Sequence, residues 1–449
     1  MKEFCVAKPT RQMHLGLFLQ GAGHHMAGWR YPGADSGGEN LQHLLRQVVR
    51  AERAKFDMVF LADGLTTSAE AHPSQIARFE PLLALATFAT ATSRIGLAAT
   101  TSTTYGEPFH TARAFSTLDQ LSGGRAAWNA VTTSYASTGA NFGVTHPPHA
   151  DRYAIAEEFI DVVKGLWDSW DDGAFPKDKA SGTYADRSKL HVLDHQGKYF
   201  SVKGPLNSSR PPQGHPIIIQ SGSSDPGQAL AARTADVVFT AQQSLDDAQA
   251  FYRGLKARLA AFGRTADSLA IMPGFLPVIG GTEAQARQKL ALLDSWTDRS
   301  KAMRMLADRL GHDISGYDPD GPVPDLPVSE QLQSRARLLA ETARRDNLTL
   351  GQLASLVAVG RGHYVMCGTS EQIADRMELW FRESGADGFN VMPPYFPGGL
   401  DDFADGVIPI LQKRGLFRTD YDGPMLHDHF GLPRPPNQHS ATSRESVRG

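Results

Sequence analysis

The sequence predicts an α/β protein, a (β/α)8 TIM barrel with long insertions that form a lid at the C-terminal face of the barrel. Two observations predict this fold. Strand-like and helix-like segments alternate along most of the chain, and the strand-like segments are short, number about eight and are mostly followed by a helix. The runner-up is an open doubly wound sheet, but no G-x-G-x-x-G motif follows the first strand.

Each predicted strand is a short run rich in apolar residues that ends at polar or glycine residues. Residues 56–61, for example, read Phe-Asp-Met-Val-Phe-Leu and are followed by Ala62-Asp63-Gly64. The predicted strands are residues 13–19, 56–61, 95–101, 125–132, 217–220, 236–240, 269–279 and 388–392.

The predicted helices show the 3.6-residue period of one buried face or carry helix end signals. Residues 40–55 place Leu41, Leu44 and Val48 on one face, and proline opens the helix at 81–92. Gly123-Gly124 ends the helix that begins at His110. The predicted helices are residues 40–55, 81–92, 110–121, 152–169, 228–235, 245–262 and 401–414.

Two long stretches interrupt this alternation. Residues 170–215 are rich in Asp, Lys, Gly and Pro, and residues 296–361 mix helical runs with a proline-rich segment. On a barrel, insertions of this length are expected at the rim, where they could cover a ligand. We therefore predict a single TIM-barrel domain over residues 13–418, and a polar, flexible tail over residues 433–449.

Composition narrows the class of function. The 449 residues include 45 Lys and Arg against 48 Asp and Glu, a net charge of −3, which gives no sign of a nucleic-acid partner. No apolar run reaches the length of about 18 residues that a membrane span needs, and the first residues lack the apolar core of a signal peptide. Only Cys5 and Cys367 are present, so we expect a cytoplasmic protein without a disulfide framework.

The loop after the fifth predicted strand is the most informative stretch of the chain. Residues 216–220 are apolar up to Gln220, and Ser221-Gly222-Ser223-Ser224 then leads directly into a helix-like segment. Such a loop leaves backbone N–H groups unpaired at the positive end of a helix dipole, which is a natural seat for a phosphate. The alternative is an ordinary strand-to-helix turn with a serine cap.

Polar side chains also follow the other predicted strands, where the working residues of a barrel gather. This set is rich in hydroxyl groups and poor in paired carboxylates, which suits a phosphorylated heterocyclic cofactor such as flavin mononucleotide (FMN). The alternative is a metal-dependent barrel hydrolase, although its candidate histidines show no H-x-H or H-E-x-x-H spacing. Its candidate ligands would be His24, His25, Asp63, His110, His146 and His149.

Several passages, in this order and spacing, resemble the bacterial-luciferase-like flavin monooxygenases. The resemblance is greatest to the branch that contains nitrilotriacetate, dibenzothiophene-sulfone and long-chain alkane monooxygenases, and it extends over most of the chain. The passages are residues 55–63 (KFDMVFLAD), 100–134, 141–143 (NFG), 149–159 (HADRYAIAEEF), 195–205 (HQGKYFSVKGP), 220–227 (QSGSSDPG) and 388–394 (GFNVMPP).

The resemblance implies a two-component monooxygenase. A separate NAD(P)H:FMN reductase would supply reduced FMN, which together with O2 would oxygenate or cleave a small organic substrate. The resemblance also implies a homodimer or a dimer of dimers. A non-catalytic flavin-binding relative is a further alternative. The sequence does not identify the substrate: aromatic residues expected near the mouth favour a neutral organic molecule over a polycarboxylate, and three arginines leave an anionic substrate open. These residues are Trp29, Tyr105, Phe109 and Trp128, and Arg30, Arg113 and Arg361.

The resemblance also implies a set of cofactor contacts and one candidate for catalysis. His24 is the candidate for a group near the reacting edge of the flavin, because an imidazole there could donate a proton. An equally weighted alternative is that His24 only orders its loop. The implied FMN contacts are Asp63, Thr100, Thr133, Ser134, His149, Tyr153, Ser223 and Ser224.

Overall fold

Eight parallel strands form a closed barrel in the computed structural model, which describes residues 11–35, 37–325 and 333–440. Neighbouring strands follow chain order around the barrel, and the pairing of β11 with β1 closes it. Closure confirms the predicted (β/α)8 barrel and excludes the open sheet. The barrel strands are β1 His14–Phe18, β2 Met58–Leu61, β3 Gly96–Ser102, β4 Ala126–Val131, β7 Ile217–Ser221, β8 Val237–Thr240, β9 Ala270–Ile279 and β11 Gly388–Val391.

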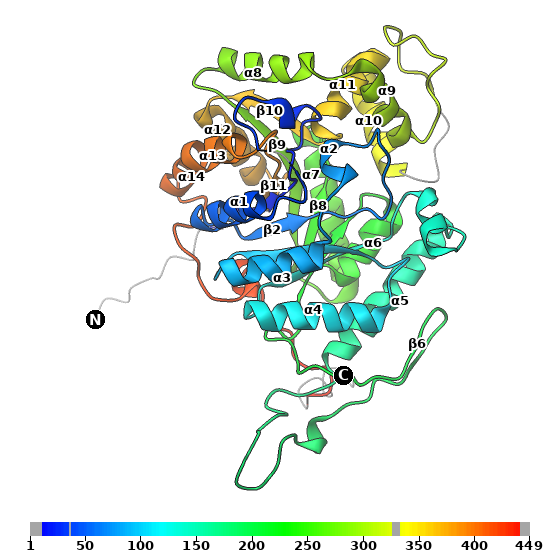
Figure 1. Ribbon diagram of the computed structural model, residues 1–449, viewed down its shortest axis with the longest axis vertical. Helices are drawn as coiled ribbons and strands as arrows, with labels where there is room; N and C mark the ends of the chain where they lie inside the picture. The colour runs from blue at the N-terminus through cyan, green and yellow to red at the C-terminus, as the bar shows by residue number, and fades with distance from the viewer. Residues whose placement is uncertain (1–10, 36, 326–332, 441–449) are drawn as a thin grey trace.

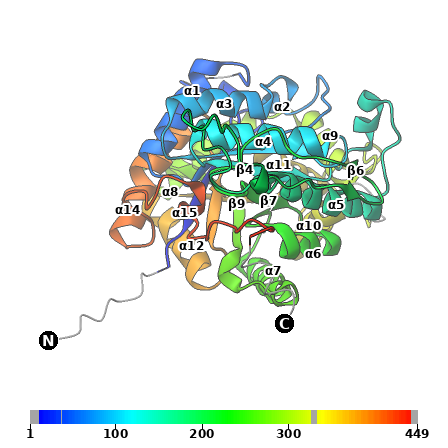
Figure 2. The same cartoon turned by 90° about the horizontal axis from the view of Figure 1, so that it is seen from below.

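Helices surround the barrel on its outside, as the view along the molecule in Figure 2 shows. Most of them begin at a side chain that caps the first turn, such as Asn40 before α1 and Thr369 before α12. α4 ends at Gly123, whose φ of +70° suits glycine. The surrounding helices are α1 Leu41–Arg53, α2 Pro73–Ile76, α3 Pro81–Ala91, α4 Pro108–Ser122, α5 His149–Trp167, α6 Asp225–Thr234, α7 Leu245–Arg258, α8 Glu283–Ser295, α12 Ser370–Arg382, α13 Gly398–Asp402 and α14 Ile408–Lys413.

Alternate residues of each strand enter two different apolar clusters. Val59, Leu97 and Trp128 pack outward against the helices, whereas Phe60 and Ala98 fill the inside of the barrel. Trp128 is fully buried among Phe115, Phe159 and Trp167. Truncation of a buried aromatic side chain of this size costs about 3–5 kcal/mol, so the outer cluster holds the strands firmly in place beneath the site.

The second insertion covers the mouth of the barrel. It contains α9 Arg299–Leu310, α10 Gln333–Arg345 and α11 Leu350–Gly360, which share an apolar core with Met26 from the loop after β1. The Met26 N–H donates to the carbonyl of Ala358 (3.2 Å), and Arg309 of α9 donates to the hydroxyl of Tyr135 (2.7 Å). β10 Tyr364–Gly368 follows and pairs with the part of β9 that extends beyond the barrel.

The first insertion, residues 170–215, does not lie at the mouth. It follows α5 and precedes β7, and a segment between a helix and the next strand lies at the N-terminal ends of the strands. Its hairpin, β5 His195–Gln196 and β6 Ser201–Val202, is at the opposite end of the molecule from α9–α11 in Figure 1. The expectation that both insertions form a lid at the C-terminal face is therefore correct for residues 296–361 and wrong for residues 170–215.

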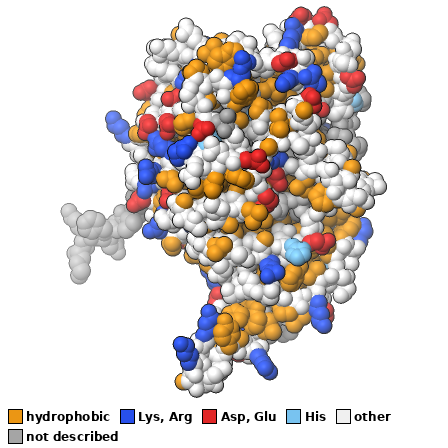
Figure 3. All heavy atoms as spheres, in the orientation of Figure 1, with side chains coloured by type: hydrophobic (Ala, Val, Ile, Leu, Met, Phe, Trp, Pro, Cys, Tyr) orange, Lys and Arg blue, Asp and Glu red, His pale blue; other side chains and the backbone are white. Residues whose placement is uncertain are grey.

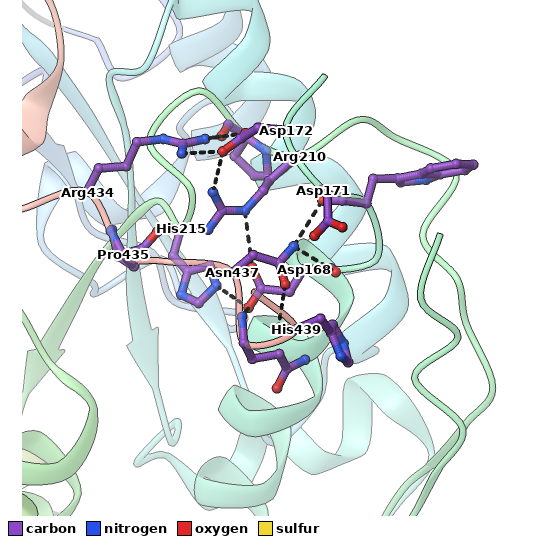
Figure 4. Close-up of polar contacts among 12 residues, drawn as sticks. Asp168, Asp171, Asp172, Arg210, His215, Arg434, Pro435, Asn437 and His439 are labelled. Carbon is purple, nitrogen blue, oxygen red and sulfur yellow. Dashed lines mark hydrogen bonds and ion pairs between the residues drawn. The ribbon is translucent and has the colours of Figure 1, made fainter. Parts of the chain in front are cut away.

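The last described residues hold the first insertion against the barrel. The short helix α15 Leu426–His429 places the buried Leu426 in the inner cluster, and residues 434–440 continue along residues 168–215 (Figure 4). Arg434 pairs with both carboxylate oxygens of Asp172 at 2.7 Å, and the amide of Asn437 donates to the carbonyls of Asp168 and Trp170. Residues 433–440 of the predicted flexible tail make these contacts, and residues 441–449 lie outside the described part. Among the described helices, none is both long and apolar enough to cross a bilayer.

Candidate active site

A cleft of about 760 Å³ opens at the C-terminal ends of β4, β7 and β8. α5 and α7 line it from the barrel side, and α10 of the second insertion lines it from above. Five of the residues expected to contact FMN, from three separate parts of the chain, line this one cleft. They are Ser134, His149, Tyr153, Ser223 and Ser224.

The loop between β7 and α6 forms a cradle of hydroxyl groups at a helix N-terminus. Ser224 is the N-cap of α6: its Oγ accepts from the N–H of Gly227 (3.3 Å) and donates to the Tyr153 hydroxyl (3.2 Å). A Cβ at Gly222 or Gly227 would lie 3.3 Å or 3.0 Å from that hydroxyl, so side chains there would crowd the cradle. The serine-cap alternative therefore describes Ser224 correctly, and the same geometry presents the first N–H groups of α6 to the cleft.

α5 contributes His149 and Tyr153, one helical turn apart, with ring centroids 5.0 Å apart in an edge-on arrangement. Between them, the buried Arg152 donates to the carbonyl of Thr133 (2.6 Å). Thr133 has a φ of +46°, a conformation that is costly for a β-branched residue. Its hydroxyl donates to Ser102 Oγ (2.7 Å), so Arg152 and Ser102 together hold the strained turn that precedes Ser134.

Thr100 is connected to the cleft through two other side chains. The amide nitrogen of Asn129 donates to Thr100 Oγ1 (2.9 Å), and Ser221 donates to the amide oxygen of the same Asn129 (2.9 Å). Because Ser221 lines the cleft, this chain of neutral groups runs across β3, β4 and β7 from the barrel interior to the cleft. Neutral donors and acceptors of this kind suit the polar edge of a heterocycle.

Aromatic residues form the floor beneath these polar groups. Phe18, Phe60 and Phe239 lie with ring centroids 5.0–5.5 Å apart inside the barrel, and Phe239 also lines the cleft. The ring of His363 stacks on Phe239 at 5.1 Å. An apolar floor with a few fixed polar groups is the common composition of a cofactor site.

His24 lies outside the cleft lining and is fully buried. Its Nε2–H donates to the carbonyl of Phe18 (2.8 Å), and its Nδ1 accepts from Arg361 (2.8 Å), which also donates to Gln20 (2.6 Å). Burial, followed by the charge of Arg361, holds the pKa of His24 well below its usual value. A neutral imidazole with both nitrogens engaged favours the loop-ordering alternative, and the catalytic role stays a prediction.

Asp63 also lies outside the cleft. It follows β2 and pairs with Arg78, whose Nε is 3.1 Å from the carboxylate, and Arg78 also donates to the carbonyl of Gly64 (2.7 Å). Among the residues that the structure describes, no three His, Cys, Asp or Glu side chains gather in a geometry that could hold a metal ion. Among the candidate metal ligands, two histidines engage other side chains: His146 Nδ1 accepts from the Tyr105 hydroxyl (2.6 Å), and His25 Nε2 is 3.0 Å from the Asp294 carboxylate.

Comparison with known proteins decides the family. The sequence pattern of the luciferase-like monooxygenases matches residues 13–388. The chain belongs to this family. It is therefore a flavin-dependent monooxygenase, an oxidoreductase, and within the family it falls in the FMN-dependent, two-component class.

Two relatives of this monooxygenase match it over nearly their whole length. N-acetyl-S-(2-succino)cysteine monooxygenase of Bacillus subtilis is 50% identical over 96% of this chain and 99% of its own. Nitrilotriacetate monooxygenase component A of Aminobacter aminovorans is 46% identical over 95% of this chain and 98% of its own. Among solved structures, a riboflavin lyase with modified FMN and riboflavin has a TM-score of 0.86 at 33% identity, covering 95% of this chain and 97% of the lyase.

Several cleft residues of the monooxygenase are absent from the set expected to contact FMN. Arg152 lies between His149 and Tyr153 in the HADRY passage, and its position in the helical repeat could have revealed it. Arg337 and Glu341 belong to an insertion whose docking surface has no sequence signal. A second cavity of about 750 Å³ lies beside β10, contains Cys367 and includes none of the expected contacts.

Proposed function

We propose that this monooxygenase accepts reduced FMN from a separate NAD(P)H:FMN reductase and uses it with O2 to oxygenate or cleave a small organic substrate. One observation carries the proposal: five residues expected to contact FMN converge on one cleft at the N-terminus of α6. The name of the relative from Aminobacter, a component A, supports a second component that delivers the flavin.

The residues of the cleft fit FMN by their chemistry. Ser223, Ser224, Tyr153 and the first N–H groups of α6 would hold the phosphate, because hydroxyls and a helix N-terminus bind anions. The chain from Thr100 through Asn129 to Ser221 would orient the polar edge of the ring system. When bound, reduced FMN supplies the electrons that activate O2.

The second insertion would exclude water while O2 reacts. α9, α10 and α11 have their own apolar core, and Met26 joins this core to the loop after β1. A buried site of this kind favours transfer of oxygen to the substrate over release of reduced oxygen species to solvent. Arg361, at the end of the second insertion, donates a hydrogen bond to His24 in the loop after β1 (2.8 Å), which connects the insertion to the barrel.

The two relatives suggest which substrates to test first. The substrates in their names each carry several carboxylates, and a sulfur or a nitrogen atom joins the acidic arms. The cleft also contains Arg152, which is compatible with an anionic substrate. We therefore place carboxylated thioethers and carboxylated amines before neutral sulfides, sulfones and alkanes.

The test combines the purified protein with a flavin reductase, NADH, FMN and O2, and analyses each substrate by mass spectrometry. The expected result is an oxygenated or cleaved product that requires both proteins. If reduced FMN binds tightly but no substrate of any class is converted, the non-catalytic alternative replaces the proposal. If neither reduced nor oxidised FMN binds, the cleft is not a flavin site.

We also infer a homodimer or a dimer of dimers in the cytoplasm. α3 and α4 lie side by side on the face shown in Figure 1, and hydrophobic side chains are exposed at several places on this face in Figure 3. Leu83 of α3 and Leu121 of α4 are 72% and 63% exposed. Exposed leucines on adjacent helices are compatible with a subunit contact. The presence of only two cysteines suits a reducing compartment.

A further inference from the structure

One face of α10 passes directly over the proposed FMN site. Arg337, Glu341 and Arg345 follow each other at intervals of four residues, so they lie on the same side of this helix. Arg345 fixes that side, because its guanidinium lies 3.3 Å from the carboxylate of Asp247 in the first turn of α7. Arg337 is about 12 Å further along the helix axis, at 1.5 Å per residue, and it lines the cleft.

The charges of the cleft leave Arg337 available for an anion. Among the described residues, the side chain of Arg337 has no hydrogen bond or ion pair. Three acids line the cleft with it: Asp225 and Asp247 pair with Arg258 and Arg345, and Glu341, one turn along α10, forms no salt bridge with Arg337. The side chain of Arg337 is exposed on the open side of the cleft. A dianionic phosphate bound at α6 would carry the charge that this guanidinium can bind in a bidentate geometry.

We propose that Arg337 binds the phosphate of reduced FMN from the side of the lid. The phosphate is then held by two separate parts of the chain, the β7–α6 loop from below and α10 from above. This inference rests on the proposed function, since it assigns a further residue to the same cofactor. It also gives the lid a reason to close on a phosphorylated flavin in preference to one without a phosphate.

The comparison of FMN with riboflavin isolates this contact, because the two differ only in the phosphate. The experiment is an anaerobic titration of the full-length protein with photoreduced FMN and with photoreduced riboflavin. We expect Arg337→Gln to weaken the binding of reduced FMN about tenfold and to leave the binding of riboflavin unchanged. Arg337→Lys should recover part of the loss, because a lysine retains the charge but not the fork geometry.

Arg344→Gln is the matched control. Arg344 is on the same helix but pairs with Asp325 (2.8 Å) and does not line the cleft, so its replacement should not change either affinity. Equal losses for FMN and riboflavin, or no loss for either, in Arg337→Gln would overturn the assignment while the proposed function stands. If the wild-type protein binds neither reduced FMN nor reduced riboflavin, both the assignment of Arg337 and the proposed function are wrong. Because Arg337 is exposed, the variant should fold, and its thermal unfolding midpoint checks this.

Discussion

Ser224 has two roles at the residue scale, and a single substitution separates them. Its hydroxyl caps α6, and the same hydroxyl contacts Tyr153 in the cleft. Aspartate is as good an N-cap as serine, so Ser224→Asp should retain the helix and the free energy of unfolding. It would also place a second anion against the proposed phosphate site, and we therefore expect the loss of measurable FMN binding in a titration.

The control for this prediction is Thr282→Asp. Thr282 caps α8 through the same contact, at 3.2 Å from the N–H of Gln285, and it does not line the cleft. Thr282→Asp replaces a hydroxyl by a carboxylate, as Ser224→Asp does. The FMN affinity of the Thr282→Asp variant should therefore equal that of the wild type. Retained FMN binding in Ser224→Asp would exclude the β7–α6 loop from the cofactor site.

The buried histidines make stability depend on pH. Burial first, and Arg361 next, hold the pKa values of His24 and His72 well below the ordinary value of 6.5. The unfolded chain therefore binds protons that the folded chain does not. The contribution of these histidines to the free energy of unfolding is fully present above about pH 6.5, and it is lost progressively as the pH decreases below this value. Each histidine contributes a slope of up to about 1.4 kcal/mol per pH unit between pH 6.5 and pH 5.

The substitution His24→Gln tests how much of this pH dependence of stability is due to His24. The glutamine amide can donate to the carbonyl of Phe18 and accept from Arg361, as the imidazole does, but it does not titrate. Urea unfolding at several pH values should give a shallower loss of stability for this variant than for the wild type. Parallel curves would mean that His24 is protonated equally in both states, against the burial described above.

Five of the residues expected to contact FMN line the cleft, whereas His24 and Asp63 lie outside its lining. Ser134, His149, Tyr153, Ser223 and Ser224 line one cleft because the ends of parallel strands meet at one face of a barrel. His24 and Asp63 also follow strands, but Arg361 and Arg78 engage them. Neither arginine is near its partner in the sequence, so the partnership could not be predicted from local pattern.

At the scale of elements, all eight barrel strands and the seven predicted outer helices occur where the pattern predicts them, within a few residues, whereas the outer helices α8 and α12 were not predicted. β10 is not one of the eight predicted barrel strands, and it pairs with the extension of β9 outside the barrel. The helices of residues 296–361 have an apolar core of their own, and their position over the mouth depends on distant contacts such as Arg309 with Tyr135. The alternation of strands and helices that predicts the barrel therefore does not predict where this insertion packs.

The lid provides the prediction at this scale. Leu353 of α11 is fully buried in the core of the insertion, and Leu353→Ala should cost about 2–5 kcal/mol, which loosens the lid locally. Water then reaches the site, so the ratio of product formed to reduced flavin oxidised should fall several-fold at saturating flavin, with a matching rise in hydrogen peroxide. Leu411→Ala in α14 removes an equally buried leucine from the barrel periphery and should leave this ratio unchanged. Unchanged coupling in Leu353→Ala would mean that the lid does not exclude water.

For the whole molecule, the two ends of the barrel have different tasks. The mouth carries the cleft and the lid, whereas the opposite end is closed by α15 and by residues 434–440 over the first insertion (Figure 4). Sequence composition predicts residues 433–449 as flexible because they are polar and rich in proline. It could not show that Arg434 and Asn437 have partners more than 200 residues away.

The network in Figure 4 provides a prediction that separates stability from cofactor binding. Asp168 is 2% exposed and accepts from Arg210 (3.2 Å) and from the N–H of Gln438 (3.2 Å), with His215 at 3.0 Å. Burial alone would raise the pKa of Asp168, but His215 and Arg210 hold it below its ordinary value, so the group is a buried carboxylate that pairs with the Arg210 guanidinium.

Loss of one partner from a buried ion pair costs about 3–5 kcal/mol, whereas a surface pair contributes about 0–1 kcal/mol. Asp168→Asn should therefore lower the free energy of unfolding in urea by several kcal/mol. Arg434→Gln, which removes a pair whose side chains are 33% and 61% exposed, should lower it by about 1 kcal/mol or less. Because this network is at the end of the barrel opposite the cleft, both folded variants should bind FMN with wild-type affinity. A loss of FMN affinity without a loss of stability in Asp168→Asn would contradict this separation of the two ends.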